Sequence, residues 1–216
     1  MQGEAEKVKS AQARPGHARP KNSGTRPLFD NPILEALSRT HIAVPISMWM
    51  VSAVVLMWYA FTYTDLSAYV IAALFTSGWF VFTLFEYVLH RYLYHLEPTT
   101  PRRAKIQYTF HGVHHEYPKD KSRLALPPAL GVVIWVVFFG LFTTLMGESA
   151  YAFYPGFLVG YSGYLLVHYI VHAYTPPKNM FKWLWINHSV HHYKDPHSNY
   201  GVSSPIWDHV FGTYMK

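Results

Sequence analysis

The sequence contains no cysteine and few charged residues. The absence of cysteine excludes disulfide bonds, thiolate metal ligands and iron–sulfur clusters. Charged residues make up 14% of the 216 positions, and apolar residues make up 50%. A typical soluble domain has roughly 25% charged residues, so this chain is unusually apolar for its length. Because cysteine is absent, histidine, with 14 copies, is the abundant residue type that can bind a transition metal.

The N-terminal region has no apolar core of the kind found in a signal peptide. Residues 1–27 are polar and contain several Pro and Gly residues, which predicts a disordered tail. Residues 28–41 follow with the pattern of a short amphipathic helix that lies on an apolar surface. We expect the remainder, residues 28–216, to form one membrane-embedded domain.

Four apolar stretches approach the roughly 20 residues that a helix needs to cross a bilayer. They cover about residues 42–63, 68–89, 128–146 and 150–171. The links inside each pair are only a few residues long, so the stretches form two helical hairpins. A soluble bundle would show a polar face on each helix, and these stretches show almost none. The sequence therefore predicts an all-α integral membrane fold with four transmembrane helices.

The basic residues predict the orientation of these helices. All 18 Lys and Arg residues lie in residues 1–41, 90–127 and 173–216. The positive-inside rule places both termini and the middle loop in the cytoplasm. There they would form a helical cap, on the cell membrane of a bacterium or the endoplasmic reticulum membrane of a eukaryote.

Ten histidines occur in four groups, each beside a predicted helix. The groups are "HRYLYH" with His90 and His95; "HGVHH" with His111, His114 and His115; "HYIVH" with His168 and His172; and "HSVHH" with His188, His191 and His192. Residues four apart share one face of a helix, so three of the groups present a pair to one ion. We expect His114 and His191 to lie close to the same faces as their neighbours. His90 and His95 are five apart and need a break in the helix, or they serve two different ions.

Ten imidazoles are too many for one metal ion, and they suit two ions with about five ligands each. Neutral imidazole binds iron, zinc, copper and nickel. A solvated His-rich tract would be contiguous and lie outside helices, unlike these groups. The sequence therefore predicts a dimetal site in the cap. The other histidines, His17, His41, His197 and His209, fall outside the repeated spacing and are interpreted as ordinary surface or packing residues.

Two carboxylates are candidates for supporting the metal ligands. Glu86 lies one turn before His90, inside an apolar stretch where a carboxylate usually has a partner. We expect it to accept a hydrogen bond from an imidazole N–H. The alternatives are that it reaches the membrane surface, or that it pairs with Arg91 or another cytoplasmic basic residue. Asp208, in "IWDHVFG", either braces the cap or makes a local turn or helix cap.

Three segments resemble the fatty acid hydroxylase superfamily, which includes sterol desaturases. They are "LFEYVLHRYLYH", "HGVHHEYPKDKSRLALPP" and "NHSVHHYKDPHSNYGVSSPIWDHVFGT", and the resemblance covers about residues 78–214. It is strongest to fatty acid 2-hydroxylases. It implies a four-span bundle with a cytoplasmic cap over a dimetal site, and it marks the same ten histidines as ligands.

The resemblance also implies an activity, cofactors and partners. The activity is hydroxylation of an acyl chain at C2, in a free fatty acid, a thioester or a ceramide. The cofactors are two iron ions, with zinc possible after isolation, together with O2 and an external donor of two electrons. The partners are the lipid bilayer, the acyl lipid and a redox protein such as cytochrome b5 or ferredoxin. No nucleic acid is expected.

The chain departs from the family pattern in two places. Fatty acid 2-hydroxylases usually carry Asp three residues before the first histidine of the third motif, where this chain has Leu165. A substrate or supporting contact is therefore missing. Eukaryotic relatives often carry a fused N-terminal cytochrome b5 domain, whereas only a short tail precedes the first stretch here. We therefore expect a separate electron donor.

Two other functions remain open. One is another member of the superfamily, a desaturase or a sterol or carotenoid oxygenase, which the change at Leu165 permits. The other is a His-rich membrane protein that stores or transports metal. A transporter should place ionisable residues along a path through the middle of its spans, whereas Glu86 is near the cytoplasmic end.

The electrons for the expected reaction must come from outside this chain, because it has no flavin or nucleotide fingerprint. A run of basic residues in the middle loop could guide the donor. It comprises Arg102, Arg103, Lys105, Lys119, Lys121 and Arg123. These residues either bind anionic lipid headgroups or attract a donor with an acidic face.

Overall fold

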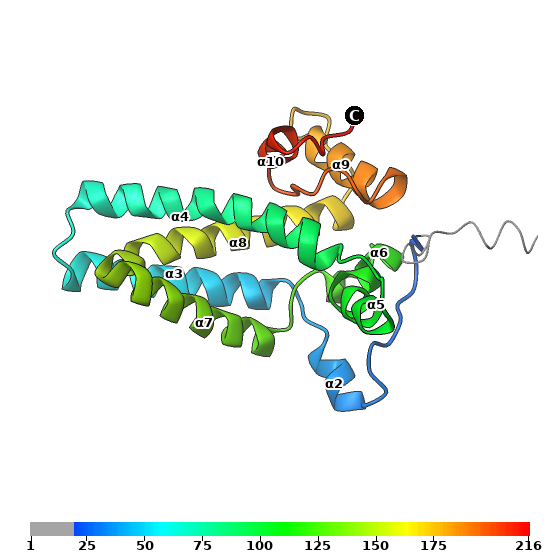
Figure 1. Ribbon diagram of the computed structural model, residues 1–216, viewed down its shortest axis with the longest axis horizontal. Coiled ribbons are helices and arrows are strands. Elements are labelled where there is room, and N and C mark those ends of the chain that lie inside the picture. Colours follow the sequence, from blue (N-terminus) through cyan, green and yellow to red (C-terminus); the bar gives the residue numbers. More distant parts are fainter. Residues whose placement is uncertain (1–19) are drawn as a thin grey trace, which may run out of the picture.

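The computed structural model describes residues 20–216, which form helices and connecting loops and include no strand. Four long helices make a bundle: α3 (Ala43–Tyr63), α4 (Ala68–Val88), α7 (Pro128–Met146) and α8 (Ala150–Ala173). Their bounds agree with the predicted stretches to within two residues. In Figure 1 the links α3–α4 and α7–α8 lie at the same end of the bundle, on the left.

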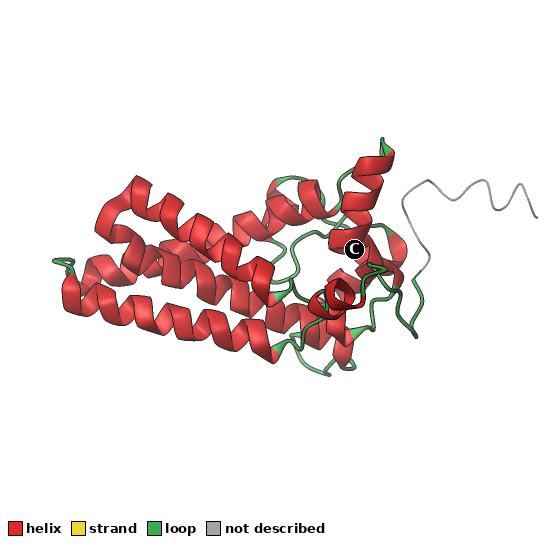
Figure 2. Cartoon of the chain, turned by 90° about the horizontal axis from the view of Figure 1, so that it is seen from below, coloured by secondary structure: helices red, strands yellow, loops and turns green. Residues whose placement is uncertain are grey.

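The other end of the bundle carries a cap of short helices, on the right in Figures 1 and 2. The cap contains α2 (Pro32–Leu37), η1 (Leu89–Tyr94), α5 (Pro101–Gln107), η2 (Tyr108–Gly112), α6 (Val113–Glu116), η3 (Lys121–Arg123), α9 (Lys182–Ser189), η5 (Val190–Lys194) and α10 (Ile206–Val210). A further short turn, η4 (Gly147–Ser149), joins α7 to α8. The cap therefore draws on segments from before, between and after the two hairpins.

Helix α8 is the centre of the bundle, and α7 lies at its edge. Most of the residues of α8 are buried, whereas Gly131 is the only buried residue of α7. Helices α4 and α8 approach closely because a glycine on each faces the backbone of the other. A Cβ at Gly78 would overlap the Phe153 carbonyl, and one at Gly156 would overlap the Phe75 carbonyl. Small residues at such crossings are typical of helix pairs inside membranes.

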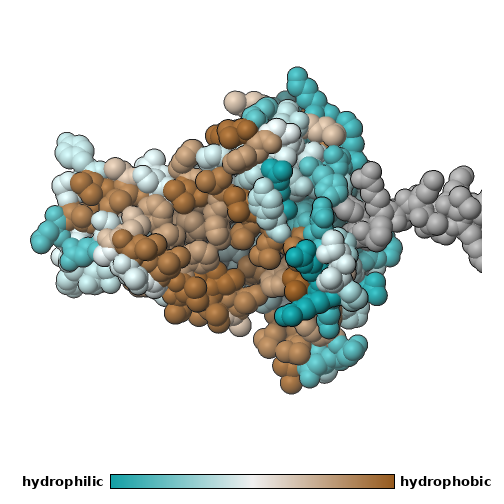
Figure 3. Space-filling model, in the orientation of Figure 1, coloured by the Kyte–Doolittle hydropathy of each residue, from teal (hydrophilic) through white to brown (hydrophobic). Residues whose placement is uncertain are grey.

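Three helical segments are long and apolar enough to cross a membrane: Ala43–Tyr63, Ala68–Tyr94 and Lys121–Ala173. The third segment has 53 residues and contains both α7 and α8. Large apolar side chains point outward from these segments, including Val54 and Val137, which are 65% and 61% exposed. Figure 3 shows the result as a wide hydrophobic band, with hydrophilic surface at the cap and at the opposite end.

The N-terminal region differs from its prediction. Residues 1–19 of the predicted tail lie outside the described residues, but residues 20–27 rest on the cap. Lys21 forms an ion pair with Glu116 at 2.6 Å, and Asn22 accepts a hydrogen bond from Tyr193 at 2.8 Å. Thr25 donates to Asp120. Residues 20–27, in the last part of the predicted tail, are thus held on the cap by partners that are distant in the sequence.

The predicted amphipathic helix at residues 28–41 is shorter in the structure, where α2 covers Pro32–Leu37. It exposes Ile33 and Leu37, which are 69% and 57% exposed. Its Glu35 pairs with Arg39 at 2.9 Å and also with Arg123. Helix α2 is thus tied to the cap through its charged residue and leaves its apolar residues uncovered.

Candidate metal centre

The structure gathers the ten predicted histidines into two groups of five. The first group contains His90, His95, His111, His115 and His191, and the second contains His114, His168, His172, His188 and His192. Within each group, one ring nitrogen from every histidine lies within 4.8 Å of the others. We refer to them below as the first group and the second group.

The two "HxxHH" motifs each contribute to both groups. His111 and His115 belong to the first group, while His114 between them belongs to the second. In the later motif the assignment is reversed, and His191 belongs to the first group. The pairs spaced four apart share a group, whereas His114 and His191, which we expected to lie close to the same helix faces, each belong to the other group. A helix turns by about 100° per residue, so adjacent histidines face two centres that lie on different sides of the helix.

His90 and His95 belong to the same group because the helix changes its pitch between them. The segment Leu89–Tyr94 is a π-helix, and the amide of His95 donates to the carbonyl of His90 at 3.1 Å. This i→i+5 hydrogen bond brings residues five apart onto one side. Short π-helical segments also carry His111 and the pair His191–His192. Such segments are rare and occur frequently at functional sites.

The spacing of the ring nitrogens fits one metal ion in each group. Neighbouring Nε2 atoms are 3.0 Å apart for His90–His111 and for His95–His191, and 2.9 Å apart for His114–His168. Imidazole nitrogens bind zinc at about 2.0–2.1 Å, so ligands at right angles lie about 3.0 Å apart and opposite ligands about 4.2 Å apart. The donor set is chemically suited to iron or zinc.

Burial keeps these imidazoles neutral. Burial and then the neighbouring imidazoles hold the pKa values of His111, His114, His115 and His188 well below their ordinary value. The pKa values of His191 and His192 are lowered in the same direction, again chiefly by burial. A neutral imidazole offers a lone pair, which is the form that binds metal.

The loop Ser198–Ser203, here called the brace loop, orients two histidines of the first group. The Nδ1 atom of His191 lies 2.7 Å from the Ser198 carbonyl, and that of His90 lies 2.5 Å from the Tyr200 carbonyl. A carbonyl can only accept, so each Nδ1 carries the proton and each Nε2 presents its lone pair to the group.

Glu86 and Asp208 hold adjacent parts of the brace loop through its backbone amides. Glu86 accepts from the amides of Val202 and Ser203 at 2.7 and 2.9 Å, and also from the Ser203 hydroxyl. Asp208 accepts from the amides of Tyr200 and Gly201, each at 2.8 Å. The prediction that Glu86 accepts from an imidazole was wrong, and Arg91 donates to Tyr87 instead. Asp208, for which we expected either a brace in the cap or a local turn or cap role, contacts the brace loop through these two amides.

Sequence reasoning did not find the brace loop, because its contribution comes from backbone carbonyls. Gly201 shows how tightly the loop is packed, since a Cβ there would overlap the Ser204 carbonyl. Asn199 adopts a positive φ of 53°, and its side chain bonds the backbone of Met215. The sequence signal that could have found it is "SNYG" at residues 198–201, a turn-forming stretch that follows the last histidine motif after the five residues 193–197.

The second group is held mainly by the helices that carry it. His168 Nδ1 lies 3.3 Å from the Leu124 carbonyl. The Nδ1 atoms of His114, His188 and His192 are buried and have no hydrogen-bond partner among residues 20–216. The second group therefore depends less on carbonyl acceptors than the first group does.

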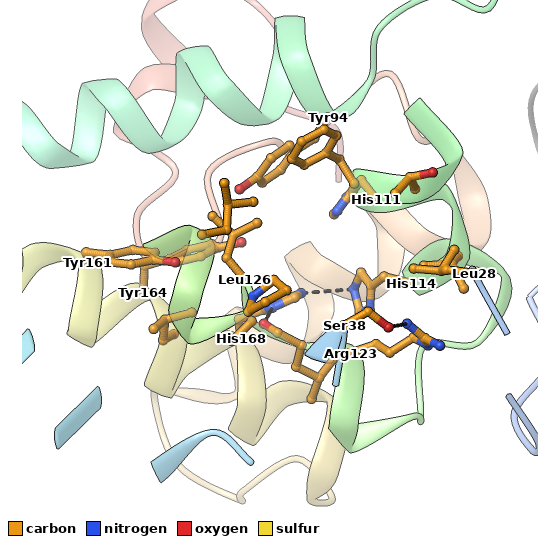
Figure 4. Close-up of a pocket in the computed structure, with 18 of the residues that line it drawn as sticks. Leu28, Ser38, Tyr94, His111, His114, Arg123, Leu126, Tyr161, Tyr164 and His168 are labelled. Atoms are coloured by element: carbon orange, nitrogen blue, oxygen red, sulfur yellow. Dashed lines mark hydrogen bonds between the residues drawn. The ribbon is translucent and has the colours of Figure 1, made fainter. Parts of the chain in front are cut away.

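A cavity of about 250 Å³ reaches both groups (Figure 4). Its wall includes His111 of the first group and His114 and His168 of the second. Leu165, at the position where the resemblance implies Asp, is buried in this wall. In Figure 4 Tyr161 and Tyr164 lie at the left of the cavity and Tyr94 at its top, while Ser38 and Arg123 lie at the lower right.

A second cavity of about 250 Å³ runs between the helices of the bundle. Its lining is largely aromatic and aliphatic, and it includes Phe85, Phe138 and Phe157. Both cavities share the residues Tyr94, Leu126, Tyr161 and Tyr164. The ring of Tyr94 stacks on His111 and that of Tyr164 stacks on His168, with centroids 5.0 and 5.5 Å apart. The apolar space of the bundle thus adjoins both histidine groups.

The sequence model for fatty acid hydroxylases matches residues 75–213, which carry all ten histidines. The chain belongs to the fatty acid hydroxylase family. It is 38% identical to the ceramide very long chain fatty acid hydroxylase scs7 of Schizosaccharomyces pombe, over 93% of this chain and 57% of that protein. It is 33% identical to the fatty acid 2-hydroxylase of Rattus norvegicus, over 87% of this chain and 56% of that protein.

A solved structure of full-length scs7p, in which only the hydroxylase domain is visible, has the same fold. The TM-score is 0.82 at 36% identity, over 90% of this chain and 74% of that chain. This member of the fatty acid hydroxylase family spans about half the length of the curated relatives it matches. Its long apolar helical segments and its relatives mark it as a membrane protein.

The predicted run of basic residues does not form one exposed surface. The side chain of Arg123 is 3% exposed and pairs with Glu35, so its expected place on a docking face was wrong. It also donates to Ser38 at 3.1 Å and forms part of the cavity wall. Lys119 and Lys121, in contrast, are exposed.

Proposed function

We propose that this chain is an O2-dependent hydroxylase that adds a hydroxyl group at C2 of a fatty acyl chain. One observation carries the proposal. Two groups of five imidazoles, each spaced for one metal ion, border a cavity that adjoins an apolar space inside a membrane bundle. The names of two similar proteins support this reaction: one is a ceramide very long chain fatty acid hydroxylase, and the other is a fatty acid 2-hydroxylase.

The ten histidines would hold two irons, five to each group. When bound, the irons would supply the activation of O2 that attack on an unactivated C–H bond requires. The protein itself orients the ligands through the brace loop and keeps them neutral by burial. It also excludes water from the ligand nitrogens, since nearly all of these side chains are buried.

The cavities indicate how an acyl chain would lie. Its alkyl tail would occupy the apolar second cavity, among Phe85, Phe138 and Phe157. Its polar end would reach the first cavity beside Tyr94 and Tyr164, whose rings stack on a histidine of each group. C2 is bonded directly to the carbonyl carbon, so this placement brings C2 to the metals. The acyl group could be free, in a thioester or in a ceramide.

We also propose a membrane arrangement with four spans and a cytoplasmic cap, in which residues 28–216 form one domain. Helix α7 ends at Met146, and the next residue, Gly147, has a positive φ of 56° and begins the short turn that leads into α8. The 53-residue segment would therefore cross twice. Cysteine is absent, so single introduced cysteines can test this. Ser67→Cys and Ser149→Cys should react from outside the cell, and Ser189→Cys only after permeabilisation. The reverse pattern would contradict the arrangement.

The function is tested by expressing the chain, with a redox donor, in a host that lacks 2-hydroxylated lipids. Mass spectrometry should find acyl chains that gain one oxygen atom at C2. The purified protein should contain two metal ions, and the His111→Ala/His115→Ala variant should contain one and form no product. Oxygen at another carbon, a new double bond, or metal content near zero in the parent protein would refute the proposal.

A further inference from the structure

A surface depression of about 400 Å³ lies beside the second group, at the cap end of α8. It differs from the two apolar cavities because it is open and partly basic. Its lining includes Lys119, Lys121, His172, Tyr174, Trp185 and Ser189. We refer to it below as the basic depression.

His172 connects the basic depression to the second group. Its Nε2 lies 2.7 Å from the Nε2 of His188 inside the group, while the residue also lines the depression. Lys119 donates to the His172 carbonyl at 2.8 Å. A lysine is stable there because the carbonyls at the C-terminal end of a helix carry partial negative charge. A positive charge is thus fixed at the surface above a candidate metal ligand.

The surroundings of the basic depression carry an excess of positive charge. Residues 171–194 contain three lysines and no Asp or Glu. On the neighbouring segment, Glu116 is paired with Lys21, and Asp120 is bonded to Thr25 and lies 3.5 Å from Arg39. The lysines at this surface therefore have few acidic neighbours to neutralise them.

Exposed apolar side chains accompany these charges. Tyr174, Met180 and Phe181 are 59%, 78% and 54% exposed, and all three belong to the segment that follows α8. Aromatic residues and methionine are enriched in protein interfaces, and a rim of charge is typical of them. The combination fits a protein partner with an acidic face.

We propose that the basic depression is the docking site of an acidic one-electron-transfer protein, and that electrons enter the second group at His172. This inference rests on the proposed hydroxylase function. The reaction converts a C–H bond and O2 to a hydroxyl group and water, and it consumes two electrons and two protons. The donor supplies the two electrons in successive encounters and is itself oxidised.

This placement separates the donor from the substrate. The apolar cavities meet the histidine groups from the bundle, at His90, His111 and His168. The basic depression meets the second group from the cap surface, at His172. A donor can therefore reach the metal centre while an acyl chain occupies the cavities.

The first experiment blocks the depression without changing its charges. Ser189→Cys, in a chain with no other cysteine, is labelled with a bulky polymer maleimide. Stopped-flow reduction of the iron-loaded protein is then measured with reduced cytochrome b5 as the donor. We expect at least a tenfold slower reduction after labelling, and an unchanged rate with dithionite, which is small. Labelled Glu97→Cys, at an exposed position before α5, is the matched control and should be reduced at the parent rate.

The second experiment measures docking without turnover. Binding of cytochrome b5 to the metal-free protein is measured by NMR titration. Lys121→Glu/Lys182→Glu should weaken this binding about tenfold at low salt, and the difference from the parent should vanish at high salt. Arg102→Glu/Arg103→Glu carries the same charge change on α5 and should bind like the parent. Lys119 is left unchanged because it contacts His172.

Three results would overturn the inference. One is unimpaired reduction by cytochrome b5 after the block at residue 189. Another is equal weakening of binding by both charge reversals. The third is that Lys121→Glu/Lys182→Glu loses binding to vesicles with anionic lipid but binds the donor like the parent. This result would assign the lysines to the membrane surface. If dithionite-driven protein forms no 2-hydroxylated lipid, the proposed function fails instead, whereas the docking results still decide the place of the donor.

Discussion

The two histidine groups have the same ligand count but different supports. The first group relies on the brace loop, whose carbonyls orient His90 and His191 and whose amides are held by Glu86 and Asp208. The second group is carried largely by helices, and the Nδ1 atoms of three of its histidines have no partner among the described residues. Two sets of five histidines can therefore be oriented in different ways. In one set a loop held by buried carboxylates orients the rings, and in the other the spacing of the histidines along helices does so.

The difference also concerns what each group faces. The first group contributes His90 to the apolar second cavity, and the second group contributes His172 to the basic depression. Both contribute to the first cavity between them. The supports and the surroundings together suggest that changes to the brace loop should affect one metal and leave the other in place.

The largest effect should come from removing ligands within or across the groups. His191→Ala/His115→Ala removes two ligands of the first group and should leave one metal ion per chain. His191→Ala/His192→Ala changes adjacent residues but weakens both groups, so it should leave close to none after dialysis against a chelator. Elemental analysis of the two variants checks this. Equal metal contents would contradict the division into groups.

Asp208→Ala should have the next largest effect. It leaves the buried amides of Tyr200 and Gly201 without acceptors, at a cost of about 2–6 kcal/mol in the free energy of unfolding. The midpoint temperature of thermal unfolding and the metal content per chain should both fall, and the metal should be lost from the first group. Asp195→Ala is the control, because Asp195 is only partly buried and its side chain accepts from the amide of His197. The comparison breaks down if both metals are lost together from Asp208→Ala.

Glu86→Gln should have a smaller effect, because the amide side chain keeps one oxygen for the Val202 and Ser203 amides. We expect a 10- to 100-fold loss of affinity for one metal ion, about the range seen when supports of ligands are changed. The other ion should bind as in the parent protein. Titration with a competing chelator resolves the two affinities, and a uniform loss at both would argue against a brace specific to the first group.

Tyr200→Phe should have the smallest effect, since the first group uses the carbonyl of this residue and not its hydroxyl. We expect less than about a threefold change in metal affinity, which is under about 0.7 kcal/mol. The same chelator titration measures it. A loss as large as that of Glu86→Gln would show that the side chain, and not the backbone, supports the group.

The sequence predicted the bundle well because membrane spans depend on local composition. The predicted stretch 128–146 matches α7, Pro128–Met146. The stretch 150–171 begins with α8, Ala150–Ala173, and ends two residues before the end of that helix. The pairs His168/His172 and His188/His192 could also be predicted, since four-residue spacing on a helix is a local property. These features need no knowledge of which segments meet in space.

The remaining features depend on distant partners. His114 joins the second group because α8 and α9 place His168, His172 and His188 beside it. The adjacent residue, His115, faces another direction and belongs to the first group. Glu86 is 116 residues from Val202 in the sequence, so its partner could not be read from its neighbours. Arg123 lies in a run of basic residues that suggests exposure, but Glu35, which is 88 residues away, draws it into the interior.

The placement of the last histidine motif has a consequence for biosynthesis. His191 completes the first group and His192 the second, and both follow all four long helices in the chain. A ribosome makes the chain from its N-terminus, so the bundle can enter the membrane before either metal site is complete. Metal loading is therefore a late event. A nascent chain stalled before residue 188 would be inserted in the membrane yet unable to assemble either five-histidine site.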